Sequence, residues 1–427
     1  MSPDDGPHVH LNPGVRGLGP SATLAINERS RALAAEGRRI YKLGLGQSPF
    51  PVPDDVVEAL RAHAAEKDYL AVRGLEALRV AVADYHRRTQ DLTCTGDDVL
   101  VGPGSKELLF LVQLAYHGDL CIPAPSWVSY GPQARILGRQ IDWLRTRAED
   151  TWKLLPADLE EHLEQEADRP RILVLNYPSN PTGVSYSPDE LQALAAVAKT
   201  YRVVVISDEI YGELHHAGAH VSIARFYPEG TIVSSGLSKW CGAGGWRLGY
   251  FVFPKPLRWL LDAMAAVASE TYTAVSAPIQ YAACAAYRPT DALADYLDRS
   301  RRVLRVLSDH LVARLRGAGV DVARPDGGFY LFPDFGAHRE ALAARGVRDA
   351  PSLCERLLDD TGVALLPGSN FGRPKRELIT RLAFVDFDGA GALHLAEPDA
   401  TYDRAWLDAA CGPTAEAIDR VVDWLRA

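Results

Sequence analysis

The sequence predicts an α/β fold in which parallel strands alternate with helices. Residues 172–175 (Ile-Leu-Val-Leu) and 203–206 (Val-Val-Val-Ile) are continuous apolar runs, as expected for strands buried on both faces of a mostly parallel sheet. Between them, Ser187 and Glu190 have the spacing of a helix capping box, with Pro188 at the first helical position. In such a fold, ligands bind at the carboxyl ends of the strands.

The N-terminal segment, residues 1–20, is rich in proline and glycine and has no periodicity, so we expect a tail or an arm that crosses to a neighbouring molecule. A helix is expected to follow from Ser21. Gly44 and Gly46 lack the third glycine of a dinucleotide fingerprint, which argues against a nicotinamide site. These glycines are expected to let the backbone approach a ligand or another segment.

An amphipathic helix is predicted over residues 54–64, and a second helix is predicted to begin after Gly74. Residues 99–102 then form a short apolar strand, followed by a turn with Gly104 and Ser105 and by an apolar-periodic helix. This order aims helix N-terminal amides and a hydroxyl at one point, which suits a phosphate. A plain strand-to-helix turn is the alternative.

Polar residues follow both central strands. Asn180 lies in the segment 176–183 after the first strand, and Asp208 and Tyr211 follow the second. A buried aspartate is costly unless it is paired, so Asp208 is expected to keep a heteroaromatic nitrogen protonated, with the Tyr211 hydroxyl turned to the same ring. The alternative is a helix N-cap aspartate beside a half-buried tyrosine. Trp127 either stacks on that ring or is a core aromatic.

Lys239 lies among small residues, directly after Ser238 and before glycines and Arg247. A lysine that forms a Schiff base needs a tight, partly dry pocket where backbone comes close to a cofactor, and small residues permit this. Arg247 can bind a phosphate, and its positive charge can also favour the neutral form of the Lys239 amine. An ordinary loop lysine is the alternative for this stretch alone.

The overall composition excludes several classes of protein. A net charge of −9 and a pI near 5.8 argue against a nucleic-acid partner. We see no apolar run long enough for a membrane span and no secretory signal pattern, so no membrane association and a cytoplasmic location are expected.

No metal site is expected from the sequence. The six cysteines include no Cys-x-x-Cys pair, so neither a disulfide framework nor a zinc site is suggested. His8 and His10 lie in a polar tail, and His215, His216 and His220 lie in a polar stretch; metal binding is the less favoured interpretation of both groups.

These motifs, in this order, resemble the fold-type I pyridoxal-phosphate enzymes, specifically the class I/II aminotransferases, from about Ser21 to the C-terminus. The segment that contains Ser238, Lys239 and Arg247 is similar to the cofactor-lysine signature of that family. The resemblance implies that pyridoxal 5'-phosphate is the cofactor and that Lys239 is its covalent partner.

The resemblance also implies the other site residues. Asp208 pairs with the ring nitrogen of the cofactor, while Tyr211 and Asn180 bind its phenolic oxygen and Trp127 stacks on its ring. The phosphate is held by Gly104, Ser105, Lys106 and Arg247, with Tyr69 contributed to the partner subunit. Ser238 is a further cofactor-binding residue. Arg381, assisted by Asn180 and the Gly46 backbone, takes the substrate α-carboxylate as a bidentate fork.

The fold that the resemblance implies has two parts and works as a homodimer with shared active sites. A large domain, residues 51–290, contains a mostly parallel seven-stranded sheet flanked by helices and binds the cofactor. A smaller α+β domain is built from both chain ends, residues 21–50 and 291–427.

The resemblance implies transfer of an amino group from an α-amino acid to a 2-oxo acid. We expect a neutral, aromatic or aliphatic donor, because Gly19 stands where relatives that use dicarboxylates often have a lysine, and residues 270–276 contain no arginine. An aspartate/glutamate-type aminotransferase, or a lyase or decarboxylase on the same scaffold, remains as the alternative. A non-catalytic regulator is disfavoured, because residues 1–20 are too short for a DNA-binding domain.

After Arg381, residues 385–413 are longer than the usual connection before the last helix, which is predicted at about 414–425. A surface loop is the favoured interpretation of this insertion, and a lining of the site entrance is the alternative.

Overall fold

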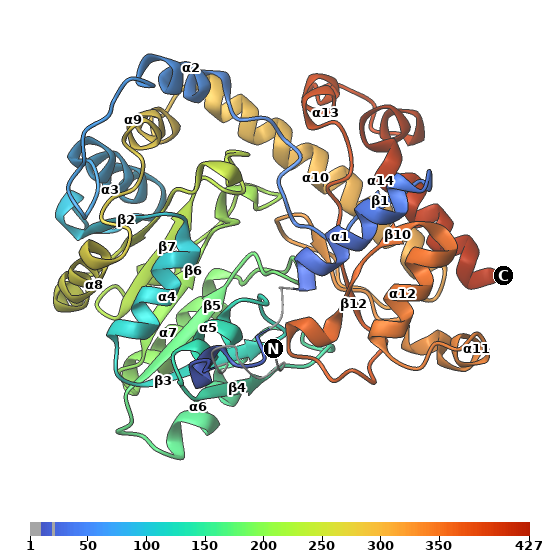
Figure 1. Ribbon diagram of the computed structural model, residues 1–427, viewed down its shortest axis with the longest axis horizontal. Coiled ribbons are helices and arrows are strands. Elements are labelled where there is room, and N and C mark those ends of the chain that lie inside the picture. The colour runs from blue at the N-terminus through green and yellow to red at the C-terminus, as the bar shows by residue number, and fades with distance from the viewer. Residues whose placement is uncertain (1–9, 19–21) are drawn as a thin grey trace, which may run out of the picture.

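The computed structural model describes residues 10–18 and 22–427, and its main feature is a seven-stranded sheet (Figure 1). The strand order is β2-β8-β7-β6-β5-β3-β4, and only β8 runs antiparallel to its neighbours. This confirms the predicted α/β class. The strands are β2 (Val99–Gly102), β3 (Asp119–Ala124), β4 (Ile141–Arg145), β5 (Arg171–Asn176), β6 (Val204–Asp208), β7 (Thr231–Gly236) and β8 (Gly249–Val252).

Helices cover both faces of this sheet, which explains why its central strands are apolar throughout. In β5, Ile172 and Val174 belong to the core with α4 (Ser105–Ala115), α5 (Tyr130–Ile136) and α8 (Arg258–Glu270). Leu173 and Leu175 belong to the core with α6 (Pro156–Glu164) and α7 (Pro188–Thr200). A strand with both faces covered needs apolar residues at successive positions.

The predicted capping box begins α7. The Ser187 hydroxyl accepts from the Glu190 amide at 3.3 Å, and a Glu190 carboxylate oxygen accepts from the Ser187 amide at 2.7 Å. These bonds satisfy N-terminal groups that the helix itself leaves unpaired.

Three further helices pack near the edge of the large sheet. They are α2 (Asp54–Ala62), α3 (Glu76–Gln90) and α9 (Ala277–Ala286). The helix predicted over residues 54–64 is therefore confirmed, two residues shorter at its end.

A second group of elements combines both ends of the chain, and Figure 1 shows it beside the large sheet, with the long helix α10 running between the two. Its strands are β1 (Tyr41–Lys42), β9 (Tyr330–Leu331), β10 (Val363–Ala364), β11 (Leu366–Pro367) and β12 (Thr380–Ala383). Its helices are α1 (Ala22–Ala35), α10 (Asp291–Gly317), α11 (Arg339–Ala344), α12 (Ala350–Thr361), α13 (Gly389–Leu395) and α14 (Arg404–Arg426). β1 pairs in parallel with β10, which joins the N-terminal segment to the C-terminal one.

The insertion after Arg381 is helical, so the prediction of a surface loop is wrong. It contains α13 and the first part of α14, which kinks at Cys411 ahead of Pro413. Trp406 and Leu407 are buried. Packing of such apolar side chains against the core stabilises these helices. Phe387 packs edge-on against Phe50, with ring centroids 6.0 Å apart.

Within the described ranges, no helix combines the length and the apolar character that a membrane crossing requires. All six cysteines are free. His216 and His220 each contact a different group: His216 lies 2.9 Å from the Gly328 carbonyl, and His220 lies 2.9 Å from Glu209.

Candidate active site

The carboxyl ends of the parallel strands bring the predicted polar residues together. β5 leads into the segment with Asn180, β6 ends at Asp208, and β7 leads through Gly236 to Lys239. The turn after β2 carries Gly104 to the same edge, beside Arg247. Because these strands are parallel neighbours, residues that are far apart in the sequence meet in one place.

The Lys239 side chain is half-buried, and its amine donates to the Gly46 carbonyl at 2.8 Å. The amine lies 5.7 Å from the centre of the Tyr211 ring. Burial, together with the positive charges of Arg381 and Arg247, lowers the pKa of Lys239 to about 8. A lysine with such a pKa is partly neutral near pH 7 and can act as a nucleophile or a base.

Asp208 is buried, and its carboxylate accepts from the Tyr130 hydroxyl at 2.6 Å and from the Ser234 hydroxyl at 3.5 Å. Burial raises the pKa of Asp208 to about 6, against the effect of these hydrogen bonds. No described cation forms an ion pair with Asp208. A buried carboxylate with only neutral donors is suited to a ligand that brings a protonated nitrogen.

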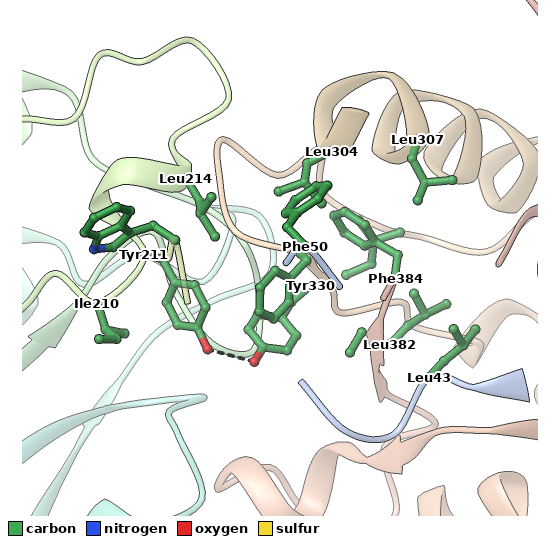
Figure 2. Close-up of a cluster of buried hydrophobic side chains, with 14 of the residues drawn as sticks. Leu43, Phe50, Ile210, Tyr211, Leu214, Leu304, Leu307, Tyr330, Leu382 and Phe384 are labelled. Atoms are coloured by element: carbon green, nitrogen blue, oxygen red, sulfur yellow. Dashed lines mark hydrogen bonds between the residues drawn. The ribbon is translucent and has the colours of Figure 1, made fainter. Parts of the chain in front are cut away.

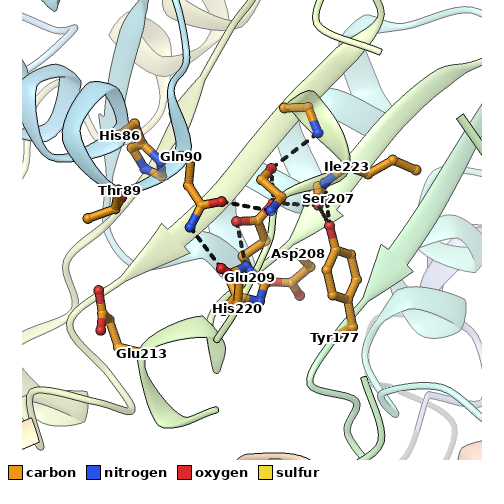
Figure 3. Close-up of polar contacts among 12 residues, drawn as sticks. His86, Thr89, Gln90, Tyr177, Ser207, Asp208, Glu209, Glu213, His220 and Ile223 are labelled. Carbon is orange, nitrogen blue, oxygen red and sulfur yellow. Dashed lines mark hydrogen bonds and ion pairs between the residues drawn. The ribbon is translucent and has the colours of Figure 1, made fainter. Parts of the chain in front are cut away.

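A hydrogen-bond network behind Asp208 fixes the end of β6 (Figure 3). The buried Glu209 carboxylate accepts from the hydroxyls of Ser207, at 2.7 Å, and Ser222, and it lies 2.9 Å from Nε2 of His220. Burial alone would raise the pKa of Glu209, but His220 and the hydroxyl donors lower it overall. Glu209 is therefore held as a carboxylate in a fixed position next to Asp208.

Tyr211, three residues after Asp208, is buried, and its hydroxyl lies 2.7 Å from that of Tyr330 (Figure 2). The Arg381 guanidinium lies 4.8 Å from the centre of the Tyr330 ring. Tyr330 therefore joins the predicted cofactor residue Tyr211 to the predicted carboxylate-binding residue. Tyr330 and Tyr130 were not predicted as site residues, because neither lies in a sequence pattern that distinguishes it from a core aromatic.

Arg381 lies on β12 and is 3% exposed, which is unusual for a charged side chain without a carboxylate partner. It donates to the Asn180 side-chain oxygen at 3.4 Å and to the Gly44 carbonyl. Its Nε is buried without a hydrogen-bond partner. No ion pair joins Arg381 to a described carboxylate, so the site has room for an anionic group on this guanidinium.

The N-terminus of α4 and Arg247 form a cradle at the end of β2. Gly104 has φ 86° and directly precedes the helix, and a Cβ there would collide with the Arg247 guanidinium. A Cβ at Gly249 would collide with the Ser105 backbone, so both glycines are needed for this close approach. The cradle combines helix N-terminal amides with a guanidinium that has no carboxylate partner among the described residues.

Lys106 follows Ser105 but is placed against Trp127, with its ammonium 5.1 Å from the ring centre. Burial and the neighbouring Arg247 lower the pKa of Lys106. Trp127 is half-buried and meets Tyr130 edge-on at 5.3 Å between ring centroids. The Lys106 ammonium therefore lies at the ring predicted to stack on the cofactor.

Three sequence predictions are not brought into this cluster. Tyr69 is 92% exposed and makes no hydrogen bond or ring contact with other described residues. Ser238 is half-buried beside Lys239, and its expected contact with the cofactor stays a prediction. Gly19 lies outside the described residues, so its expected effect on the choice of amino donor stays a prediction.

The residues present fit pyridoxal phosphate. The cradle at Gly104 suits a phosphate, the buried Asp208 suits a protonated ring nitrogen, and Lys239 has the lowered pKa that a covalent partner needs. Arg381, with its unpartnered Nε, suits a substrate carboxylate.

Comparison with known proteins agrees with this arrangement. The family model described as "Aminotransferase class I and II" matches residues 38–385. Aspartate aminotransferase of Geobacillus stearothermophilus is 35% identical over 382 residues, covering 87% of this chain and 94% of the relative. An aspartate/prephenate aminotransferase of Thermus thermophilus is 33% identical over 366 residues, covering 84% of this chain and 91% of the relative.

Among solved structures, aspartate aminotransferase of Thermus thermophilus with maleate superposes with a TM-score of 0.83 at 28% identity, covering 97% of this chain and 100% of that one. The family match spans most of the chain, and the relatives align over nearly their whole length. The chain thus belongs to the class I and II aminotransferases of fold type I, which use pyridoxal phosphate.

Proposed function

We propose that this aminotransferase uses a dicarboxylic amino acid, with aspartate as the preferred donor, and a 2-oxo acid as acceptor. The relatives named above are aspartate or aspartate/prephenate aminotransferases, which favours the aspartate-type alternative over the neutral donor that we expected from the sequence. The observation that carries the proposal is the Lys106 ammonium over Trp127, because it offers a second carboxylate a cation.

Arg381 is the proposed partner of the α-carboxylate. Its guanidinium can offer two parallel N–H donors to one carboxylate, and its position between Asn180 and the Tyr330 ring fixes its plane. Burial strengthens this interaction, since little water competes for the guanidinium. The α-carbon of a bound amino acid is then held in one orientation.

Lys106 is the proposed partner of the side-chain carboxylate. It has no carboxylate partner among the described residues, and its ammonium lies over the Trp127 ring. The phosphate contact predicted for Lys106 from the sequence stays a prediction. A lysine can supply this charge even though residues 270–276 contain no arginine. The distal carboxylate of aspartate would therefore not be buried unpaired.

Lys239 is the proposed catalytic base. Pyridoxal phosphate, when bound, supplies the electron sink that stabilises negative charge at the substrate α-carbon. The Lys239 amine, with its pKa near 8, takes the α-proton and returns it on the way to the product. Asp208 would keep the ring nitrogen of the bound cofactor protonated, and Tyr211 would offer its hydroxyl to the same ring.

The active unit is proposed to be a homodimer in which Tyr69 serves the phosphate site of the neighbouring subunit, with the domain division at residues 51–290 retained. The exposed position of Tyr69 supports this, since the side chain has no described partner within its own chain. Mixing Tyr69→Phe subunits with Lys239→Ala subunits should restore one intact site per heterodimer. Activity that fails to recover after demonstrated subunit exchange would contradict shared sites.

The substrate proposal is tested by replacing Lys106 with methionine. The Lys106→Met variant should lose about 10- to 100-fold in kcat/KM for aspartate, since a hydrogen bond to a charged group contributes about 1.5–3 kcal/mol. For asparagine, which is nearly the same shape without the charge, kcat/KM should change less than about threefold. Lys199→Met, which removes an exposed lysine paired with Glu229, is the matched control.

Three outcomes would count against the proposal. An equal loss of kcat/KM for aspartate and asparagine, together with weaker cofactor binding, would indicate that Lys106 binds the cofactor phosphate instead. A higher kcat/KM for phenylalanine or leucine than for aspartate in the unmodified enzyme would support a neutral amino donor instead. Exchange of the α-proton without amino transfer would indicate a lyase-type reaction.

A further inference from the structure

The edge of the large sheet away from β2 carries a cluster of metal-ligand side chains that the aminotransferase reaction does not use. Cys121 lies on β3, Asp142 on β4 and His162 on α6. We infer that these three side chains form a binding site for a divalent zinc ion. The inference is independent of the substrate proposed above.

The three ligand atoms converge on one point. Nε2 of His162 lies 4.0 Å from Sγ of Cys121 and 3.4 Å from Oδ2 of Asp142, and all three atoms lie within 4.8 Å of one another. Tetrahedral zinc, with bonds of about 2.3 Å to sulfur and about 2.0–2.1 Å to nitrogen and oxygen, separates such ligands by about 3.6 Å (S to N) and about 3.3 Å (N to O). The two distances to Nε2 of His162 need to contract by only a few tenths of an ångström, and the Cys121 and Asp142 ligand atoms already lie within 4.8 Å of each other.

The same imidazole nitrogen faces both partners, and this distinguishes the cluster from a hydrogen-bonded Cys-His-Asp triad. In a triad, one ring nitrogen meets the carboxylate and the other meets the nucleophile. Here Nε2 alone meets both Cys121 and Asp142. One nitrogen cannot serve a thiol and a carboxylate through its single lone pair or proton, but a metal between the three atoms satisfies all of them.

The backbone holds the ligands in place. Cys121 and Asp142 are register partners in the parallel pair β3–β4, so their side chains leave the sheet on the same face. α6 packs on that face through Leu159 and Leu163, which share a core with Cys121. The site is therefore built from three elements that the hydrophobic core already positions.

The ligand set and its surroundings favour zinc over harder cations. A thiolate, an imidazole and a carboxylate match zinc, whereas magnesium and calcium prefer oxygen ligands alone. Cys121 is buried, while the side chains of Asp142 and His162 are each 27% exposed, so water can reach the fourth position. On binding, the Cys121 thiol loses its proton to solvent, and the thiolate and Asp142 together balance the two charges of the ion.

The test measures zinc binding to untagged, cofactor-loaded enzyme after dialysis against a chelator. We expect one zinc ion per chain, and at least about a 100-fold loss of zinc affinity in Cys121→Ser. Loss of a group that only hydrogen-bonds to a zinc ligand already costs about 10–100-fold. Cys284→Ser, which changes a partly buried cysteine outside the cluster, should bind zinc as the unmodified enzyme does. Asp142→Asn provides a second variant with almost unchanged shape.

Circular dichroism and cofactor content verify that each variant is folded. Zinc should also raise the melting temperature of the unmodified enzyme and of Cys284→Ser, but not that of Cys121→Ser. Equal zinc affinity in Cys121→Ser and the unmodified enzyme, or no zinc binding by the unmodified enzyme, would overturn the inference. If Cys121→Ser fails to fold, the same comparison of zinc affinity is made between Asp142→Asn and the unmodified enzyme, and equal affinities would again overturn the inference.

Discussion

The buried pair of Glu209 and His220 should be essential for stability, and His220→Leu tests this. The Glu209 and His220 side chains are only 4% and 10% exposed. Leucine fills most of the histidine's volume but leaves the Glu209 carboxylate buried with only the hydroxyls of Ser207 and Ser222 as donors. Removing one partner of a buried pair costs about 3–5 kcal/mol, because the remaining charge is uncompensated.

This free energy can be converted into a shift of the melting temperature. With about 2.1 cal/mol/K per residue, unfolding of 427 residues has an entropy of about 0.9 kcal/mol/K, so His220→Leu should lower the Tm by about 3–6 °C. His63→Leu is the matched control, since His63 pairs with Glu66 at an exposed position. An exposed pair contributes less than about 1 kcal/mol, so its Tm should fall by about 1 °C or less.

The assay is thermal unfolding followed by circular dichroism, at one protein concentration and with saturating cofactor. A Tm of His220→Leu within about 1 °C of the unmodified enzyme would refute the reasoning, since it would mean that Glu209 is not held as a buried charge. Equal losses in both histidine variants would show that the leucine itself, rather than the lost pair, is responsible.

Three further predictions concern the active site. Arg381→Lys should lower kcat/KM by at least about 100-fold for aspartate and asparagine alike, because a lysine cannot form the two-pronged contact; a selective loss for aspartate alone would contradict the α-carboxylate role. In the cofactor-free enzyme, the rate at which Lys239 binds pyridoxal phosphate should rise with pH and level off above about 8, because only the neutral amine attacks. A midpoint of this pH dependence near 10.5 would contradict the lowered pKa of Lys239. Gly46→Ala should abolish most activity while the protein still folds, since a Cβ at Gly46 collides with the Tyr330 hydroxyl and displaces the carbonyl that Lys239 contacts. Full activity of this variant in steady-state kinetics would show that the backbone at Gly46 can move without cost.

Features with a local cause were predictable from the sequence. The apolar runs of β5 and β6 and the capping box of α7 are confirmed, because burial on two faces and helix capping act on residues close together in the chain. The predicted cofactor lysine, Lys239, is recognisable for the same reason, since the small residues that it needs are its own neighbours. These local signals were also sufficient for the family.

Contacts between distant segments were decided only by the tertiary structure. Tyr330 meets Tyr211, and Lys106 turns to Trp127, because separate elements are packed against one another. The insertion after Arg381 is helical because its apolar side chains pack against other segments, and its own sequence pattern does not predict this packing.

The Cys121 cluster shows the same limit most clearly. Its ligands have no short spacing along the chain, and the absence of Cys-x-x-Cys pairs argued against zinc. Pairing of β3 with β4 and the packing of α6 bring the three side chains together. Sequence patterns report neighbours along the chain, whereas a site built across strands depends on sheet register and on which helix covers the face.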